Sequence, residues 1–435
     1  MATWQSTACA TVRICEELVT SEVVERDFDP LWYQSAYPDV RALGMEPHEH
    51  YQKYGKMMGR KPVPDVRALR RLIFVVPDIS TIGGMASRTR TTLSHGQSRS
   101  VEYCAITARS ANGGRQAGEY CYATDPVEFE RALNAWLPTD TAMVISNNAI
   151  RSFPIAVRER IQQFPIIYIS AGQLAFMLQD SKVLKDREYV RDFRAMRIMS
   201  FSEGDINFQR QLGIHGQVRG FAPVKQRALN MYDVSKNVRI GYVGRIDFHA
   251  KDCAKLLDVA QSLRERSWGP IRVYTTDGRN SPDYSRFRLM IEEQGLEDQF
   301  EIVLNETDKT VIYQDLALLV VPSKKESFGN VVVESMSFGV PVIAASYAPG
   351  PAEIIEDGRS GWLLDEFTGS NVVALIDALT PERLHRASVC AFERHKHYRV
   401  EAHVEQIEEL ARGAVESFTG VNTLPVFPYM KVLDG

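Results

Sequence analysis

Two carboxylates, Glu326 and Glu334, bracket a turn between an apolar run, residues 316–322, and a run with helical character that begins at Asn330. Gly329 lets a ligand approach the backbone closely, and we expect Asn330 to be the helix N-cap. The N–H groups of the next helical turn would then suit an anion such as phosphate. Asn330 and Glu334 are four positions apart, so Glu334 can point back toward the same opening.

Cations and glycines follow other predicted strands. They are a glycine pair after residues 72–76, a Gly-Arg pair after residues 238–243 and a lysine near the next helix: Gly83, Gly84, Gly244, Arg245 and Lys251. Any one of them could be a solvated charge or an ordinary turn residue. Because strand ends line the binding crevice of open α/β sheets, their joint placement predicts a single ligand site.

The composition is that of a soluble globular protein. The 435 residues are 44% hydrophobic and 24% charged, and this length favours two or three domains. The net charge of −4 argues against a dedicated nucleic-acid binder. We find no apolar run long enough for a membrane helix and no signal peptide, so we expect a cytoplasmic location. The six cysteines lack CxxC spacing, which favours reduced, buried thiols over a metal site.

Strand-like and helix-like runs alternate from Arg71 onward, which predicts an α/β fold with two parallel-sheet, Rossmann-like domains facing a cleft. We expect four parts: a small helical and aromatic module, an acceptor domain, a donor domain, and a C-terminal helix with a tail. Their predicted bounds are residues 1–64, 70–225, 236–395 and 396–435. We expect the C-terminal helix to pack back on the first of the two large domains.

Four elements in this order resemble glycosyltransferase family 4, a large GT-B-fold, retaining family with many bacterial members. They are the glycine pair at 83–84, the VGR…K element at 243–251, the EX7E motif at 326–334 and the GPxEII…GxxGWLL element at 350–364. The resemblance covers residues 71–410. A glycine pair alone would be weak evidence, but four ordered elements at strand ends are specific.

The resemblance implies a role for each site residue. Arg245 and Lys251 would clamp the donor diphosphate, where negative charge accumulates as the anomeric bond breaks. Glu326 would bind sugar hydroxyls, and Glu334 would bind the ribose diol. Backbone N–H groups of the segment Phe328, Gly329, Asn330 and Val331 would approach the sugar and phosphate, Gly244 would belong to the donor loop, and Gly83 and Gly84 would let the other domain close.

The same resemblance implies a metal-independent enzyme with no cofactor beyond its nucleotide-diphosphate sugar. The donor phosphate itself would accept the acceptor's proton, so no dedicated nucleophile is expected. Two positions depart from the family pattern. A donor-contacting histidine is replaced by the sequence Ala171-Gly-Gln173, which leaves that role vacant or moves it to Gln173, Asn147 or Asn148, and Asp252 stands where glycine is common.

The N-terminal block is dense in aromatic residues and resembles a short module attached to bacterial polysaccharide glycosyltransferases. Trp32, Tyr33 and Tyr37 could form its own core, or they could present a carbohydrate- or partner-binding surface. The DxD spacing at residues 27–29 and the pair His48 and His50 could suggest a metal, but no further ligand cluster stands nearby.

These observations favour a retaining glycosyltransferase that acts on a cell-surface polysaccharide or glycolipid acceptor. One alternative is a glycan- or partner-binding protein with a catalytically weak GT-B body. Another is a nucleotide-sugar epimerase, which the absence of an obvious general-base histidine disfavours. The basic run at residues 182–197 is either a solvated helix face or a peripheral contact with the inner face of an anionic membrane.

Overall fold

The computed structural model describes residues 28–62, 68–80, 84–96, 100–109, 118–146, 149–170, 197–211, 217–224, 239–264, 266, 268–276, 278 and 281–418. The chain divides into two compact units. The first comprises residues 1–220 and 401–435, and the second comprises residues 221–400. Each unit is described by itself below.

The N-terminal module consists of short helices, and each α-helix begins with a proline, a residue whose fixed φ suits the first helical position. They are α2 (Pro30–Ala36), α3 (Pro38–Leu43) and α4 (Pro47–His50), followed by the π-helical turn η1 (Tyr51–Gly55). Tyr33 is fully buried, and Trp32 and Tyr37 pack against the core that it forms with Phe28 and Val40. These aromatic residues therefore build the module's own core.

The two metal-like spacings in this module have structural roles. The carboxylate of Asp29 accepts the N–H of Trp32 at 3.0 Å and caps α2, while Asp27 lies outside the described residues. His50 is buried, and its Nδ1 lies 3.3 Å from the hydroxyl of Tyr33. Among the described residues, no group of three or more His, Cys, Asp or Glu side chains could hold a metal ion.

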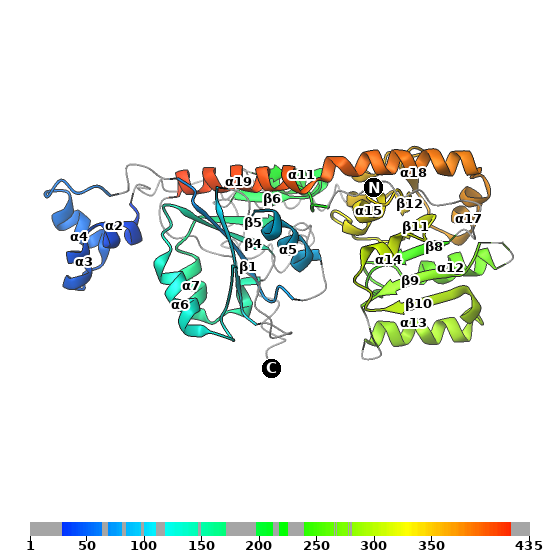
Figure 1. The fold of residues 1–435 in the computed structure, drawn as a ribbon, viewed down its shortest axis with the longest axis horizontal. Helices are drawn as coiled ribbons and strands as arrows, with labels where there is room; N and C mark the ends of the chain where they lie inside the picture. The colour runs from blue at the N-terminus through cyan, green and yellow to red at the C-terminus, as the bar shows by residue number, and fades with distance from the viewer. Residues whose placement is uncertain are drawn as a thin grey trace. The chain divides into compact units, whose positions relative to one another are not determined.

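In its described part, the first unit contains a parallel sheet in the order β3-β2-β1-β4-β5-β6-β7 (Figure 1). The strands are β1 (Arg71–Val76), β2 (Glu102–Thr107), β3 (Glu119–Cys121), β4 (Thr141–Ser146), β5 (Ile166–Ser170), β6 (Arg197–Ser200) and β7 (Gln217–Arg219). The helices are α5 (Gly84–Gly96), α6 (Pro126–Ala135), α7 (Ile155–Ile161) and α11 (Glu203–Gln211), with the 3-10 turn η2 (Ala149–Ser152). Apart from β3, each strand overlaps an apolar run of the sequence.

The strand order places helices on both faces of this sheet. The chain moves outward from β1 to β2 through α5 and then returns past β1 to β4 through α6. Because such crossovers are right-handed, α5 covers one face while α6 and α7 cover the other (Figure 1). The side chains of α6 and α7 pack with the central strands into one core, which includes Ile73, Phe129, Leu133, Met143, Val157 and Ile161.

The second unit contains a parallel sheet in the order β10-β9-β8-β11-β12-β13 in its described part. The strands are β8 (Ile240–Val243), β9 (Ile271–Thr275), β10 (Phe300–Leu304), β11 (Leu318–Val321), β12 (Val342–Ala345) and β13 (Gly361–Leu364). The α-helices are α12 (Ala254–Leu263), α13 (Pro282–Glu293), α14 (Lys309–Tyr313), α15 (Asn330–Met336), α16 (Pro349–Ile354), α17 (Gly369–Asp377) and α18 (Pro381–His395), and the 3-10 turns are η3 (Glu297–Gln299) and η4 (Lys396–Tyr398). The order reverses between β8 and β11, which are direct neighbours.

The long helix α19 (Val400–Ser417) packs into the first unit through a buried hydrogen bond. The hydroxyl of Tyr103, on β2, donates to Oε1 of Glu408 at 2.6 Å, and Arg412 pairs with the other oxygen at 2.8 Å. Tyr103 and Glu408 are both buried. Each carboxylate oxygen of Glu408 thus has a defined donor.

Two further features bear on the class of protein. No helix in the described ranges is long and apolar enough to cross a membrane. Cys104, Cys121 and Cys253 are buried free thiols, whereas Cys390 is partly exposed, and Cys9 and Cys15 lie outside the described residues. The expected burial is therefore found for Cys104, Cys121 and Cys253 but not for Cys390.

We expect Tyr103→Phe to lower the free energy of unfolding by about 1–3 kcal/mol, because it removes a donor from a buried carboxylate. Urea unfolding of the full chain measures this change. Tyr54→Phe is the control, since Tyr54 is exposed and an exposed hydroxyl should contribute less than about 0.5 kcal/mol. Equal stability of the two variants would contradict the role given to the hydrogen bond.

Candidate functional site

The predicted donor residues of the second unit gather where the order of its sheet reverses. The segment after β8 carries Arg245 and Lys251, and the segment after β11 carries Glu326. Because β8 and β11 pair in parallel, both segments leave the same carboxyl edge side by side. This reversal point is where open α/β sheets bind ligands.

The segment after β8 turns sharply and is held from within. Gly244 has a φ of 156°, a backbone conformation that favours glycine, and the hydroxyl of Tyr242 donates to the carbonyl of Arg245 at 2.6 Å. Asp247 then accepts the N–H groups of His249 at 2.8 Å and Ala250 at 2.7 Å. The loop that carries Lys251 is therefore built around one aspartate.

The ionisation of Asp247 follows from these contacts. Burial alone would raise its pKa, but the N–H groups of Ala250 and His249, together with the nearby Arg245, hold the pKa below its ordinary value. The carboxylate is thus charged at neutral pH. Burial has the opposite consequence for Cys253, whose pKa it raises, so this thiol stays protonated.

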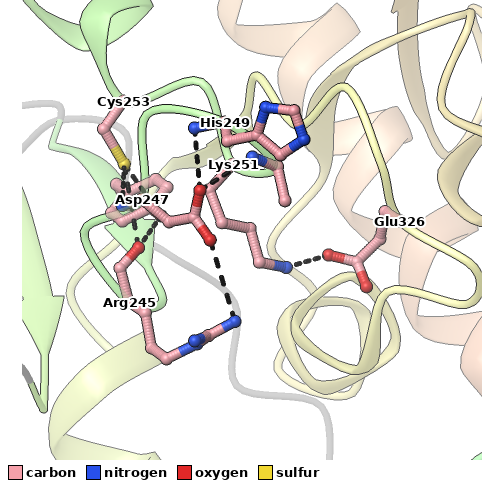
Figure 2. A network of polar contacts seen from close by, with 8 residues as sticks. Arg245, Asp247, His249, Lys251, Cys253 and Glu326 are labelled. Atoms are coloured by element: carbon pink, nitrogen blue, oxygen red, sulfur yellow. Dashed lines mark hydrogen bonds and ion pairs between the residues drawn. The ribbon is translucent and has the colours of Figure 1, made fainter. Parts of the chain in front are cut away.

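The segment after β11 is fastened onto this loop. The N–H groups of Lys324 and Lys325 donate to the carbonyl of Ala250 at 2.9 and 3.1 Å. Next to this connection, the ammonium group of Lys251 forms an ion pair with the carboxylate of Glu326 (Figure 2). Two residues that are 75 positions apart in the sequence are thereby brought into contact.

Arg245 differs from this pair in its exposure. The side chains of Lys251 and Glu326 are 22% and 16% exposed, whereas that of Arg245 is 67% exposed. Its guanidinium lies 3.8 Å from a carboxylate oxygen of Asp247, beyond ordinary hydrogen-bond distance (Figure 2). Arg245 is therefore a loosely held cation on the same loop as a tightly held one.

Two glycines let the Glu326 segment pack tightly. Gly350 donates its N–H to the carbonyl of Glu326 at 2.8 Å, and a Cβ at position 350 would lie 2.4 Å from the carbonyl oxygen of Phe328. Gly329 has a φ of 89°, in the left-handed region that favours glycine. Val331, one residue inside α15, is partly exposed.

The expected N-cap is wrong by one residue. Gly329 is the N-cap of α15, and Asn330 is its first helical residue. The left-handed conformation that Gly329 can adopt already turns the chain into the helix, so the asparagine side chain caps nothing. The helix ends at Met336.

Glu334 has two partners that the sequence pattern did not reveal. Its Oε2 lies 2.8 Å from the ammonium group of Lys309 and 3.1 Å from the hydroxyl of Tyr313, both on α14. Burial first, and then the neighbouring carboxylate of Glu334, raise the pKa of Tyr313 well above its ordinary value, so this hydroxyl donates. The sequence offered one indication of this contact: Lys309 stands at the start of a helix, where the helix dipole disfavours a cation unless a carboxylate lies nearby.

Asp252, which departs from the family pattern, is buried and has a φ of 52°. Its carboxylate lies 2.9 Å from the ammonium group of Lys324. Aspartate tolerates the left-handed region better than most residues, and the ion pair ties the two segments together a second time. The departure thus preserves the turn that a glycine would make.

Several predicted site residues cannot be placed. Gly83, Asn147, Asn148 and Gln173 lie outside the described residues, as do residues 182–196 of the basic run. Gly84 is the first residue of α5, at the carboxyl end of β1 in the first unit. Its predicted role toward the donor stays a prediction.

Residues 233–389, which contain this site, match the protein family described as "Glycosyl transferases group 1". The tandem parallel-sheet units define the class of fold as GT-B. A solved structure of the same fold is that of Alr3699/HepE from Anabaena in complex with UDP and glucose, with a TM-score of 0.61, 15% identity, and coverage of 78% of this chain and 98% of that one. The predicted α/β, GT-B fold class is confirmed.

Curated relatives match over shorter stretches. AmsD, an amylovoran biosynthesis glycosyltransferase of Erwinia amylovora, is 27% identical over 143 residues, which are 32% of this chain and 38% of AmsD. A sucrose synthase of Beta vulgaris is 28% identical over 131 residues, which are 28% of this chain and 17% of the synthase. The chain thus spans less than two fifths of the length of these relatives.

We expect Gly350→Ala to displace the Glu326 segment, because the new methyl group would meet the backbone of Phe328. Overpacking of this kind costs about 1–3 kcal/mol. Thermal unfolding of the full chain measures this loss of stability. Gly269→Ala is the control, since nothing lies within 4 Å of a Cβ there; a harmless Gly350→Ala would contradict the close packing.

Proposed function

We propose that the chain is a retaining glycosyltransferase that moves a sugar from a nucleotide-diphosphate sugar to a cell-surface polysaccharide or glycolipid acceptor. The observation that carries the proposal is the contact between Lys251 and Glu326 at the reversal point of the second sheet. The match of residues 233–389 to glycosyltransferases supports it. HepE, which shares the fold and binds UDP and glucose, suggests UDP-glucose as the first donor to test.

The paired charges suit a sugar phosphate. In such a donor, a phosphate is joined directly to a carbon that neighbours a hydroxyl group. The ammonium group can bind the phosphate, and the carboxylate beside it can accept a hydrogen bond from the hydroxyl group. The two charges therefore lie side by side, as the phosphate and the hydroxyl do in the donor. Lys251 would therefore face the phosphate, while Glu326 accepts hydrogen bonds from the sugar.

Catalysis requires stabilisation of the leaving diphosphate. As the anomeric bond breaks, its electron pair moves to the diphosphate, and cations placed there in advance lower the barrier. Lys251 is already held in place, and the exposed Arg245 can swing to the same phosphates. The acceptor hydroxyl would attack from the face that the diphosphate leaves, which retains the anomeric configuration, and its proton would pass to a phosphate oxygen.

The nucleoside would lie next to Glu334. This carboxylate has one oxygen directed to Lys309 and Tyr313, and a carboxylate can accept further hydrogen bonds from a ribose diol. Lys309 would add positive charge near the same nucleotide. The second unit would thus bind the nucleotide at Glu334 and the reacting phosphate at Lys251.

We expect Lys251→Met to lower the rate of sugar transfer from UDP-glucose by at least about 100-fold, in line with losses of preorganised charge elsewhere. Glu326→Gln should lower it as well, since the amide keeps the size of the side chain but loses its charge. Initial rates with the purified protein measure both effects. Sugar release to water serves as the readout when no acceptor is known.

Lys255→Met is the matched control for this experiment. Lys255 stands four positions after Lys251, on α12, and is not a member of the ion pair. Its variant should transfer at the rate of the native protein. Transfer that survives both Lys251→Met and Glu326→Gln would show that these residues do not perform the reaction.

We expect transfer to continue in excess EDTA, because Arg245 and Lys251 would supply the positive charge that a divalent ion supplies in other enzymes. The rate should stay within about twofold of the rate measured without the chelator. Activity that is lost in EDTA and restored by Mn²⁺ or Mg²⁺ would overturn metal independence while leaving the transfer reaction itself intact.

A further inference from the structure

Arg88, in the second turn of α5, is a buried cation without a carboxylate partner among the described residues. It is 7% exposed, and burial lowers its pKa to about 10, so it still carries its charge at neutral pH. Its guanidinium carbon lies 5.1 Å from the centre of the Phe201 ring. A cation–π contact stabilises the charge but satisfies none of the five N–H donors.

The guanidinium lies at the carboxyl edge of the first sheet. α5 begins at Gly84, eight positions after the last residue of β1, and helical side chains tilt toward the helix N-terminus. The side chain of Arg88 therefore reaches back toward that end. Phe201 follows β6 and marks the same edge, since all strands of this sheet run parallel.

Two positive features meet at this edge. The first N–H groups of α5 have no partner within the helix and carry the positive end of its dipole, which disfavours a nearby cation. Arg88 adds a full charge with little solvent to screen it. Burying an unpaired charge is costly, so this arrangement would be stabilised by an anion.

Asp205, an acidic residue on the helix that follows β6, has partners of its own. Asp205, on α11, accepts the hydroxyl of Ser170 at 2.7 Å and the amide of Gln209 at 2.9 Å. The same amide also donates to Ser200 at 2.9 Å. This polar cluster connects β5, β6 and α11.

We propose that Arg88 and the first turn of α5 form a phosphate-binding site of the first unit, which holds a phosphate group of the acceptor. This inference rests on the proposed transferase function, because it assigns the acceptor's chemistry. A guanidinium together with a turn of backbone N–H groups offers donors from two directions, which fits the tetrahedral oxygens of a phosphate better than the planar oxygens of a carboxylate.

The probe for this site is inorganic pyrophosphate, with affinity measured by titration calorimetry on the full chain. Arg88→Met should weaken the binding of pyrophosphate to the site in the first unit at least tenfold. Because the donor site also binds phosphates, the measurement is repeated in the Lys251→Met background. There, pyrophosphate binding should persist and should disappear when Arg88→Met is added.

Arg160→Met is the matched control. Arg160 is also partly buried and lies 5.7 Å from a phenylalanine ring, that of Phe164. Phe164 precedes β5, so this second arginine lies at the amino edge of the same sheet, where no phosphate is expected. The variant should bind pyrophosphate as the native protein does.

Arg88→Lys keeps the experiment decisive if Arg88→Met does not fold. It preserves the charge but loses the two-pronged geometry, so we expect affinity to fall between about threefold and tenfold. Unchanged affinity in either Arg88 variant, in the Lys251→Met background, would overturn the site. If Arg88→Met instead weakens UDP-glucose binding tenfold, the phosphate belongs to the donor and the acceptor assignment is wrong.

Loss of transfer in the Lys251 and Glu326 variants does not bear on this result, since pyrophosphate binding is measured without turnover. Conversely, a protein that transfers no sugar could still bind pyrophosphate at Arg88. The site and the transferase function can therefore fail separately.

Discussion

The parallel pairing of β8 with β11 is the constraint on which the second unit depends. Ile240 lies opposite Leu318, and Gly241 lies opposite Leu319. A Cβ at position 241 would come within 2.3 Å of the Leu316 side chain, so any larger residue there would displace this buried leucine. The pairing brings the loops after β8 and β11 to one edge of the sheet. There the carbonyl of Ala250 accepts hydrogen bonds from the backbone N–H groups of Lys324 and Lys325. The ion pair follows from that connection.

Much of this fold could be predicted from apolar runs, because strands that are covered on both faces must be hydrophobic throughout. β3 (Glu119–Cys121) has no continuous apolar run, so the same criterion could not detect it. It is a three-residue edge strand that contains a buried glutamate, and that glutamate is satisfied by the hydroxyl of Thr107 at 2.8 Å. A polar residue that finds its partner on a neighbouring strand leaves no periodic signal in the sequence.

The sequence was sufficient to predict which loops form the site, but not which side chains contact one another there. Spacing and residue type placed Lys251 and Glu326 at strand ends, yet their pairing depends on how the two loops are joined. Lys309 and Tyr313 were missed because they reach Glu334 from an element 21 to 25 positions earlier. Asn330 was misplaced because two residue types that favour helix starts stand side by side, and the backbone of Gly329 decided between them.

The two units hold their cations in different ways, and burial determines what each can do. Arg245 is mostly exposed, so solvent stabilises its charge and the side chain can change conformation at little cost. Arg88 is buried beside the ring of Phe201, so its side chain is already positioned. The free-energy cost of desolvating its charge is part of folding and does not have to be met when a ligand binds. A group that binds at Arg88 therefore gains a preorganised partner, whereas one that binds at Arg245 must first order it. Strong, rigid recognition is thus expected in the first unit, and adaptable charge stabilisation in the second.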